Sequence, residues 1–144
     1  MKIQQILASK GMNVITVQPQ QLVREAIALL AKHHIGALVV MGDEGKPVGI
    51  LSERDIIRRA AESEDFFAES VANLMTERLI TGIPEDDTFS VAATMTERRF
   101  RHLPIMDEGQ LIGIVSIGDI LKAERDQYRG EIDTLETRIL AGEG

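Results

Sequence analysis

The chain has 144 residues, a formal net charge of −7 and 44% hydrophobic residues, enough for one compact domain or two closely packed halves. It has no cysteine and is only 3% aromatic, which excludes disulfides and cysteine-based metal or nucleophile sites and disfavours a base-stacking surface. The acidic balance argues against nucleic acid as a partner. Because the chain has neither a signal peptide nor an apolar run of about 18 residues, we expect a cytoplasmic protein without a membrane partner.

Apolar spacing in the first half of the chain alternates between helical and strand periods. Gly11 ends the first helical pattern and Pro19 ends the first strand. A Gly-rich turn over 42–45 joins two apolar runs, which indicates a hairpin. The expected elements are a helix over 1–11, a strand over 14–17, a helix over 21–34, strands over 37–41 and 48–51, and a helix over 53–62.

A bridge over 63–78 precedes a second set of elements in the same order. We expect a short helix to begin at Phe66 and Phe67, and Val71, Leu74 and Met75 to mirror the lead-in helix. The further elements are a strand over 79–81, a helix over 87–98, strands over 102–106 and 111–116, and a long helix that ends near residue 140.

The last helix carries a narrow apolar seam. Tyr128, Ile132, Leu135 and Ile139 are spaced four, three and four residues apart, as in a helix that packs along one face. An isolated helix of this length needs a partner for such a seam. We expect it to pack against the protein's own body or a twin subunit, and a site for another protein is the alternative.

One short stretch occurs twice and identifies the chain as a repeat protein. Gly49-Ile50-Leu51-Ser52-Glu53-Arg54-Asp55-Ile56 recurs as Gly113-Ile114-Val115-Ser116-Ile117-Gly118-Asp119-Ile120, 64 residues later. Each copy is a buried strand that runs directly into a helix. Two such copies predict two examples of one structural unit.

The serine and aspartate of each copy have two interpretations. As a capping box, the serine oxygen accepts from a backbone amide and the carboxylate accepts from the cap residue. As a ligand site, the helix N-terminus and the serine bind a phosphate while the carboxylate accepts from ribose hydroxyls. The two roles do not exclude each other.

The order strand, helix, strand, strand, helix, closed in each copy by the glycine-to-aspartate stretch, resembles the cystathionine-β-synthase (CBS) domain pair, or Bateman module. Phe100-Arg101-His102-Leu103-Pro104-Ile105 resembles that family's second-strand signature, and the tail helix resembles a bacterial stand-alone subgroup. The resemblance implies an α+β fold in which two β-α-β-β-α repeats pack about a pseudo-twofold axis, with a C-terminal helix. We divide the chain into a first repeat with its lead-in helix over 1–62, a bridging helix over 63–78, a second repeat over 79–125 and a helical tail over 126–144.

The resemblance also implies two clefts that bind adenine nucleotides, among them AMP, ADP, ATP, NAD(H) and S-adenosylmethionine. The resemblance assigns roles to the residues of this chain that match the family's motif. Aspartates would bind ribose, serines phosphate, and two threonines with their neighbours would frame the adenine by backbone contacts. The implied ligand residues are Ser52, Asp55, Ser116 and Asp119 in the repeated stretch, Thr16, Val17, Thr81 and Gly82 about the adenine, Ala37 and Val39 in one pocket, and His102 and Pro104 in the other.

The basic residues near the second hairpin have two possible interpretations. Arg98, Arg99 and Arg101 are either solvated charges at a helix end or a phosphate clamp, for which Arg101 and Arg54 are the candidates. The two copies differ, because Arg54 corresponds to Gly118 and Gly36 to Arg101.

We therefore expect a regulatory adenine-nucleotide sensor of energy or redox state, homodimeric and acting on an unnamed partner protein. The first alternative is a structural or interaction module with empty clefts, in which both boxes are only caps. An enzyme is the second alternative, and the sequence offers no metal site, nucleophile or Gly-rich phosphate loop for one.

Overall fold

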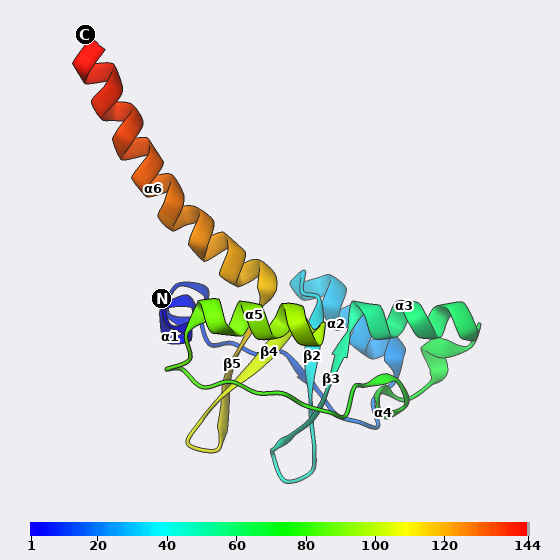
Figure 1. The fold of residues 1–144 in the computed structure, drawn as a ribbon. Coiled ribbons are helices and arrows are strands. Elements are labelled where there is room, and N and C mark those ends of the chain that lie inside the picture. Colours follow the sequence, from blue (N-terminus) through cyan, green and yellow to red (C-terminus); the bar gives the residue numbers. More distant parts are fainter. Residues whose placement is uncertain (144) are drawn as a thin grey trace.

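Two small sheets and the helices around them repeat one arrangement in the two halves of the chain (Figure 1). In the computed structural model the backbone is described for residues 1–143 and the side chains for residues 1–130. The first half contains α1 (Ile3–Lys10), β1 (Thr16–Val17), α2 (Val23–His33), β2 (Ala37–Met41), β3 (Pro47–Ser52) and α3 (Glu53–Glu62). A 3-10 turn, η1 (Phe66–Ala68), and α4 (Val71–Leu74) lead to α5 (Thr88–Arg98), β4 (His102–Asp107), β5 (Gln110–Ser116) and α6 (Ile117–Glu143). The α+β class is thus as expected, and so is the order of the elements except for one strand in the second half.

The two hairpins have the same register irregularity. β2 pairs antiparallel with β3 and β4 with β5, and the pairing shifts between Val40 and Met41 and again between Ile105 and Met106. β1 adds a parallel strand to the first sheet. The two hairpins therefore correspond in their pairing and in the position of the irregularity.

The strand expected over 79–81 is not formed. Gly82 instead makes one parallel bridge with Ile105, since its N–H donates to the Pro104 carbonyl (2.9 Å) and its carbonyl accepts from the Met106 N–H (2.8 Å). One bridge is too short to count as a strand, and Pro84 follows within two residues. The position is nevertheless equivalent to that of β1 in the first sheet.

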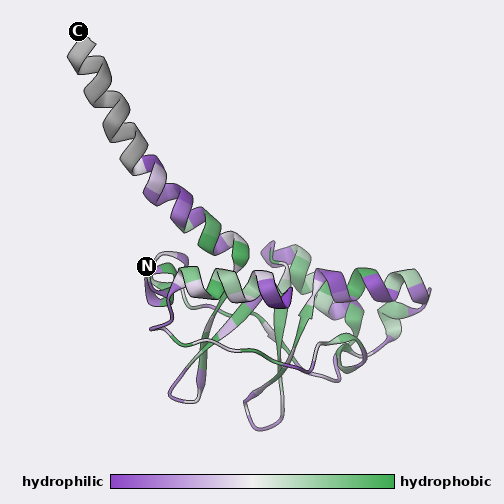
Figure 2. Ribbon diagram, in the orientation of Figure 1, coloured by the Kyte–Doolittle hydropathy of each residue, from purple (hydrophilic) through white to green (hydrophobic). Residues whose placement is uncertain are grey.

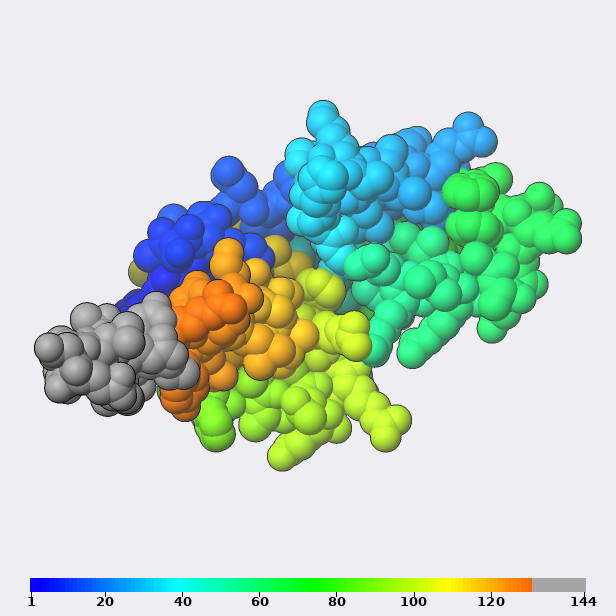
Figure 3. Space-filling view, turned by 90° about the horizontal axis from the view of Figure 1, so that it is seen from above, coloured from blue at the N-terminus to red at the C-terminus, as the bar shows by residue number. Residues whose placement is uncertain are grey.

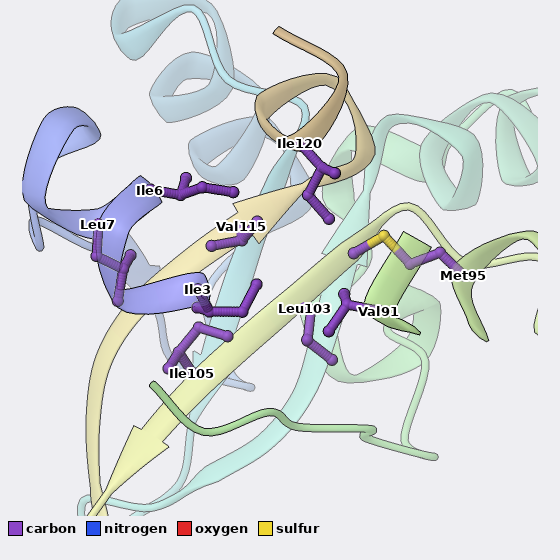
Figure 4. Close-up of a cluster of buried hydrophobic side chains, with 9 residues drawn as sticks. All are labelled: Ile3, Ile6, Leu7, Val91, Met95, Leu103, Ile105, Val115 and Ile120. Carbon is purple, nitrogen blue, oxygen red and sulfur yellow. The ribbon is translucent and has the colours of Figure 1, made fainter. Parts of the chain in front are cut away.

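Each lead-in helix packs on the core of the opposite half. Ile3, Ile6 and Leu7 of α1 are buried with side chains of α5, β4, β5 and α6, as Figure 4 shows. Val71 and Leu74 of α4 are buried in the other core, with side chains of β1, α2, β2 and β3. The two halves therefore exchange helices.

Matching hydrogen bonds fix both exchanged helices. Ile3 N–H donates to the Asp86 carbonyl (2.9 Å), and Val71 N–H donates to the Gln21 carbonyl (2.8 Å). The next residue in each helix donates to the carbonyl of a proline, Pro84 or Pro19, at 2.9 Å in both cases. This correspondence supports the expected pseudo-twofold relation between the halves.

The long helix α6 begins against the second sheet and extends away from the body of the molecule (Figure 1). Of the expected apolar seam, Tyr128 has 65% of its surface exposed, while the side chains of Ile132, Leu135 and Ile139 lie outside the described residues. No helix in the described part of the chain combines the length and hydrophobicity needed to cross a bilayer.

Candidate functional site

The first elbow, where β3 passes into α3, is a complete capping box. Ser52 is the N-cap, and its Oγ accepts from the Asp55 N–H at 3.3 Å. Asp55 Oδ2 accepts from the Ser52 N–H at 2.9 Å and from the Ser52 hydroxyl at 3.1 Å. The capping interpretation of this motif is therefore confirmed, and the second oxygen, Oδ1, faces Thr76, whose hydroxyl lies 3.4 Å away.

The second elbow, where β5 passes into α6, has the same internal geometry. Ser116 Oγ accepts from the Asp119 N–H at 3.0 Å, and Asp119 Oδ2 accepts from the Ser116 N–H at 2.8 Å. The repeated sequence thus forms the same capping box twice, and differences between the two sites come from the residues that differ within the stretch, such as Arg54 and Gly118, and from the segments around it.

A cavity of about 350 Å³ adjoins the first elbow, a volume within the range of small-molecule sites. Both halves of the chain line it, since α3 and β3 come from the first half and the segments before and after α5 from the second. Six predicted ligand residues meet there: Ser52, Arg54, Asp55, Arg101, His102 and Pro104. Figure 3 looks down on this face, where the end of α5 (yellow-green) lies beside α3 (blue-green).

Further residues in this cavity were not predicted as ligands. Thr76, Arg78, Leu79 and Ile80 reach it because the chain after α4 crosses the first elbow, where Thr76 and Ile50 exchange two backbone hydrogen bonds of 2.8 and 3.0 Å. The repeat in the sequence could have identified these residues. They lead into the second repeat in the same way that the residues near Gly11 lead into the first. Gly36, Ile50, Glu53, Arg58, Arg98, Arg99 and Phe100 complete the lining.

Lys10 occupies the corresponding place at the second elbow. Its Nζ donates to the Ile114 carbonyl at 2.7 Å and lies 2.6 Å from Asp119 Oδ2. Ile114 corresponds in sequence to Ile50, so the lysine ammonium takes the position that the Thr76 N–H takes in the first half. The two elbows therefore differ: Asp55 borders a cavity, while Asp119 is ion-paired within the chain.

The surroundings of Asp119 lower the pKa of its carboxyl group. Burial alone would raise the pKa, but the hydrogen bond from Lys10 and the Ser116 N–H outweigh it. At neutral pH the group is an anion that already has a cationic partner.

His102 lies between the two elbows. Burial lowers the pKa of its imidazole, and the Lys10 charge lowers it further against the opposing effects of Asp119 and Glu53. The ring is thus neutral at pH 7 and can both donate and accept a hydrogen bond.

The remaining predicted ligand residues lie elsewhere. Val17, Ala37 and Val39 are buried in the first sheet, with 2%, 5% and 0% of their surfaces exposed, and Thr16 pairs with Val39 at its edge. Thr81 lines a separate cavity of about 230 Å³ beside α5, next to Gly82. Backbone contacts from these segments to an adenine stay a prediction. Among the described residues no group of acidic, histidine or cysteine side chains is arranged to hold a metal ion.

Comparisons with known proteins agree with the fold described above. The family model of the CBS domain matches residues 4–62 and 71–126. The mitochondrial CBS domain-containing protein CBSX3 of Arabidopsis thaliana is 32% identical over 97% of this chain and 72% of its own length. The crystal structure of the CBS-domain protein ATU1752 from Agrobacterium tumefaciens has a TM-score of 0.82 at 36% identity, covering 85% of this chain and 92% of that one. The CBS domain pair of MJ0100, solved in complex with 5′-methylthioadenosine and S-adenosylmethionine, has a TM-score of 0.78 at 26% identity, covering 88% of this chain and 98% of its own.

Proposed function

The chain belongs to the CBS domain family, and on this premise we propose that it is a regulatory module that binds an adenine nucleotide in the cleft at Asp55. Stand-alone members of this family are typically regulatory and not catalytic, and we infer no catalytic activity here. The observation that carries the proposal is the cavity between the halves. It brings together the Asp55 carboxylate, which can bind a ribose, the N-terminus of α3 and several arginines.

Each part of a nucleotide has a fitting partner in this cleft. Asp55 Oδ1 faces the cavity side of the capping box and can accept from ribose hydroxyls, displacing the long 3.4 Å contact to Thr76. The N-terminus of α3 and the guanidinium groups favour phosphate. The adenine assignment is supported by the adenosine ligands in the similar MJ0100 domain pair.

The mechanism would follow from the position of the cleft. A ligand that contacts α3 from one half and the end of α5 from the other stabilises one relative orientation of the two halves. It shifts that equilibrium only by the difference between its affinities for the two orientations. We propose that a separate cytoplasmic protein, regulated by this module, detects the change.

We also propose that the protein is a homodimer. Large apolar side chains remain exposed on helices of the described part, among them Ile57 (67%) on α3 and Phe89 (75%) on α5. The family resemblance supports a second copy as the partner. Light scattering behind a sizing column tests this, and a monomer at micromolar concentration would contradict it.

Thermal unfolding with AMP, ADP, ATP, NADH and S-adenosylmethionine tests the ligand proposal. A ligand at 100 times its dissociation constant should add about 2.7 kcal/mol to the free energy of unfolding. The same panel on Asp55→Ala is the control, and its shift should be lost. If no adenine compound shifts the wild-type transition, the chain is instead a structural module in which both boxes serve only as caps.

A further inference from the structure

Six of the eleven arginines of this acidic chain line one cleft. Arg54 and Arg58 come from α3, Arg78 from the segment after α4, and Arg98, Arg99 and Arg101 from the end of α5 and the loop after it. All six side chains are exposed. The facing ends of α5 and α3, which carry most of them, are hydrophilic in Figure 2.

None of these six arginines forms an ion pair with any acidic side chain in the described part of the chain. The neighbouring Arg59 shows the contrast. Its Nε lies 3.2 Å from Glu69, its Nη1 3.7 Å from Glu62, and its Nη2 donates to the Asn73 carbonyl at 3.1 Å. The arginine that faces away from the cleft is thus compensated by the protein, while those in the cleft are not.

The charge balance of the cleft is opposite to that of the whole chain. Only two carboxylates, Glu53 and Asp55, line the cavity beside the six guanidinium groups, which leaves a formal excess of four positive charges. Like charges held together are unfavourable without a counter-charge. One phosphate monoester carries about two negative charges at pH 7, so it would compensate only about half of this excess.

The positive region also continues beyond the first cavity. An adjoining cavity of about 370 Å³ shares Arg54, Arg99, Phe100 and Arg101 with it and extends towards Thr96 and Ile117. A ligand whose ribose sits at Asp55 therefore has arginine-lined space for more than one phosphate. Guanidinium groups bind phosphate oxygens in pairs of hydrogen bonds, so separate arginines can serve separate phosphates.

We propose that this cleft selects a nucleotide with at least two linked phosphates over the corresponding monophosphate. The inference rests on the proposed function and names the ligand class of the same site. Arg58 from one half and Arg101 from the other bind the same phosphate chain. A polyphosphate therefore stabilises one relative orientation of the halves more than a monophosphate does.

Calorimetric titration of the full chain with adenosine, AMP, ADP, ATP and inorganic tripolyphosphate tests this in buffer without divalent cations. We expect ADP or ATP to bind about tenfold more tightly than AMP, because each additional charge-assisted pair of hydrogen bonds contributes at about that level. The advantage should shrink as salt rises, since these arginines are exposed.

Two variants and a matched control locate the effect. Arg58→Gln and Arg101→Gln should each weaken ATP binding about tenfold and AMP binding much less. Arg24→Gln, an exposed arginine on α2 outside the cleft, should change neither. Circular dichroism confirms the fold of each variant.

The outcomes separate the two proposals. Equal affinities for AMP, ADP and ATP would overturn the polyphosphate inference and leave the nucleotide function intact. Tight binding of tripolyphosphate without any adenine nucleotide would support the polyphosphate site and overturn the adenine proposal. Equal losses of AMP and ATP affinity in both variants, or no binding of any of the five compounds, would overturn the inference.

Discussion

At the scale of single residues, Asp55 and Asp119 occupy equivalent positions but have different partners. Both complete a capping box, yet only Asp119 is ion-paired, with Lys10 at 2.6 Å. Local sequence fixes the box in both cases. The lysine, which is 109 residues away along the chain, changes what the second carboxylate can bind.

We predict that Asp55→Ala and Asp119→Ala have different consequences. Asp55→Ala should cost about 1 kcal/mol of stability through its cap and abolish nucleotide binding at the cleft. Asp119→Ala should cost up to about 1 kcal/mol more, because it also removes a partly exposed ion pair, but should leave nucleotide affinity nearly unchanged. Urea unfolding and ligand titration measure the two effects.

A double-mutant cycle with Lys10→Met isolates the contribution of the ion pair. The coupling energy between Lys10→Met and Asp119→Ala should be favourable and no larger than about 1 kcal/mol. Additive losses in the double variant would show that the pair is not formed in solution.

His102 should make stability depend on pH near neutrality. Burial, and then the charge of Lys10, lower the pKa of the folded imidazole from its ordinary 6.5, so the unfolded chain takes up a proton there first as the pH falls. Stability from this group is complete above about pH 6.5 and declines as the pH falls towards the lowered value. Urea unfolding between pH 7.5 and 5.5 should show a smaller decline in His102→Gln. An identical decline in both proteins would rule out this histidine as the cause.

At the scale of elements, the lead-in helices have different lengths. α1 has eight residues and reaches Lys10, while α4 has four and ends at Leu74. The shorter helix lets the chain run extended past Ile50, which exposes the cavity at Asp55. The longer helix carries its lysine to the second elbow. The two elbows therefore have different surroundings because equivalent helices end at different points.

Two glycines beneath these segments give a matched test of the packing. A Cβ on Gly49 would lie 2.8 Å from the Met75 sulfur and 2.9 Å from the Thr76 carbonyl oxygen, while a Cβ on Gly113 would lie 2.7 Å from Leu7 Cδ2. The Thr76 backbone is fixed by its hydrogen bonds to Ile50, but a leucine methyl group can move. Gly49→Ala should therefore lose about 1–3 kcal/mol and Gly113→Ala less, as measured by urea unfolding. A larger loss in Gly113→Ala would contradict this account of the contacts.

At the scale of the whole molecule, the exchange of α1 and α4 makes the two halves depend on each other. Each core takes side chains from a helix on the other side of the sequence boundary. Neither half therefore has a complete core without the other.

Because each half completes the other's core, we predict a single cooperative unfolding transition for the full chain. Fragments 1–65 and 66–144 should be largely unfolded alone and should regain helical structure when mixed. Calorimetry and circular dichroism measure these outcomes. Two resolved transitions, or an independently folded fragment, would show that the exchanged helices contribute little to either core.

The sequence alone determined the repeat, the order of most elements, both capping boxes and the acidic overall charge, because these depend on local periodicity and on residue type. It also singled out Asp55, Arg54 and Arg101, which do meet in the cleft. Tertiary structure decided which core receives each lead-in helix, that Lys10 reaches Asp119, and that Thr76 and Arg78 border the site of Asp55. The physical reason is that two similar halves offer similar apolar surfaces, so only the packed molecule shows which distant segments cover them.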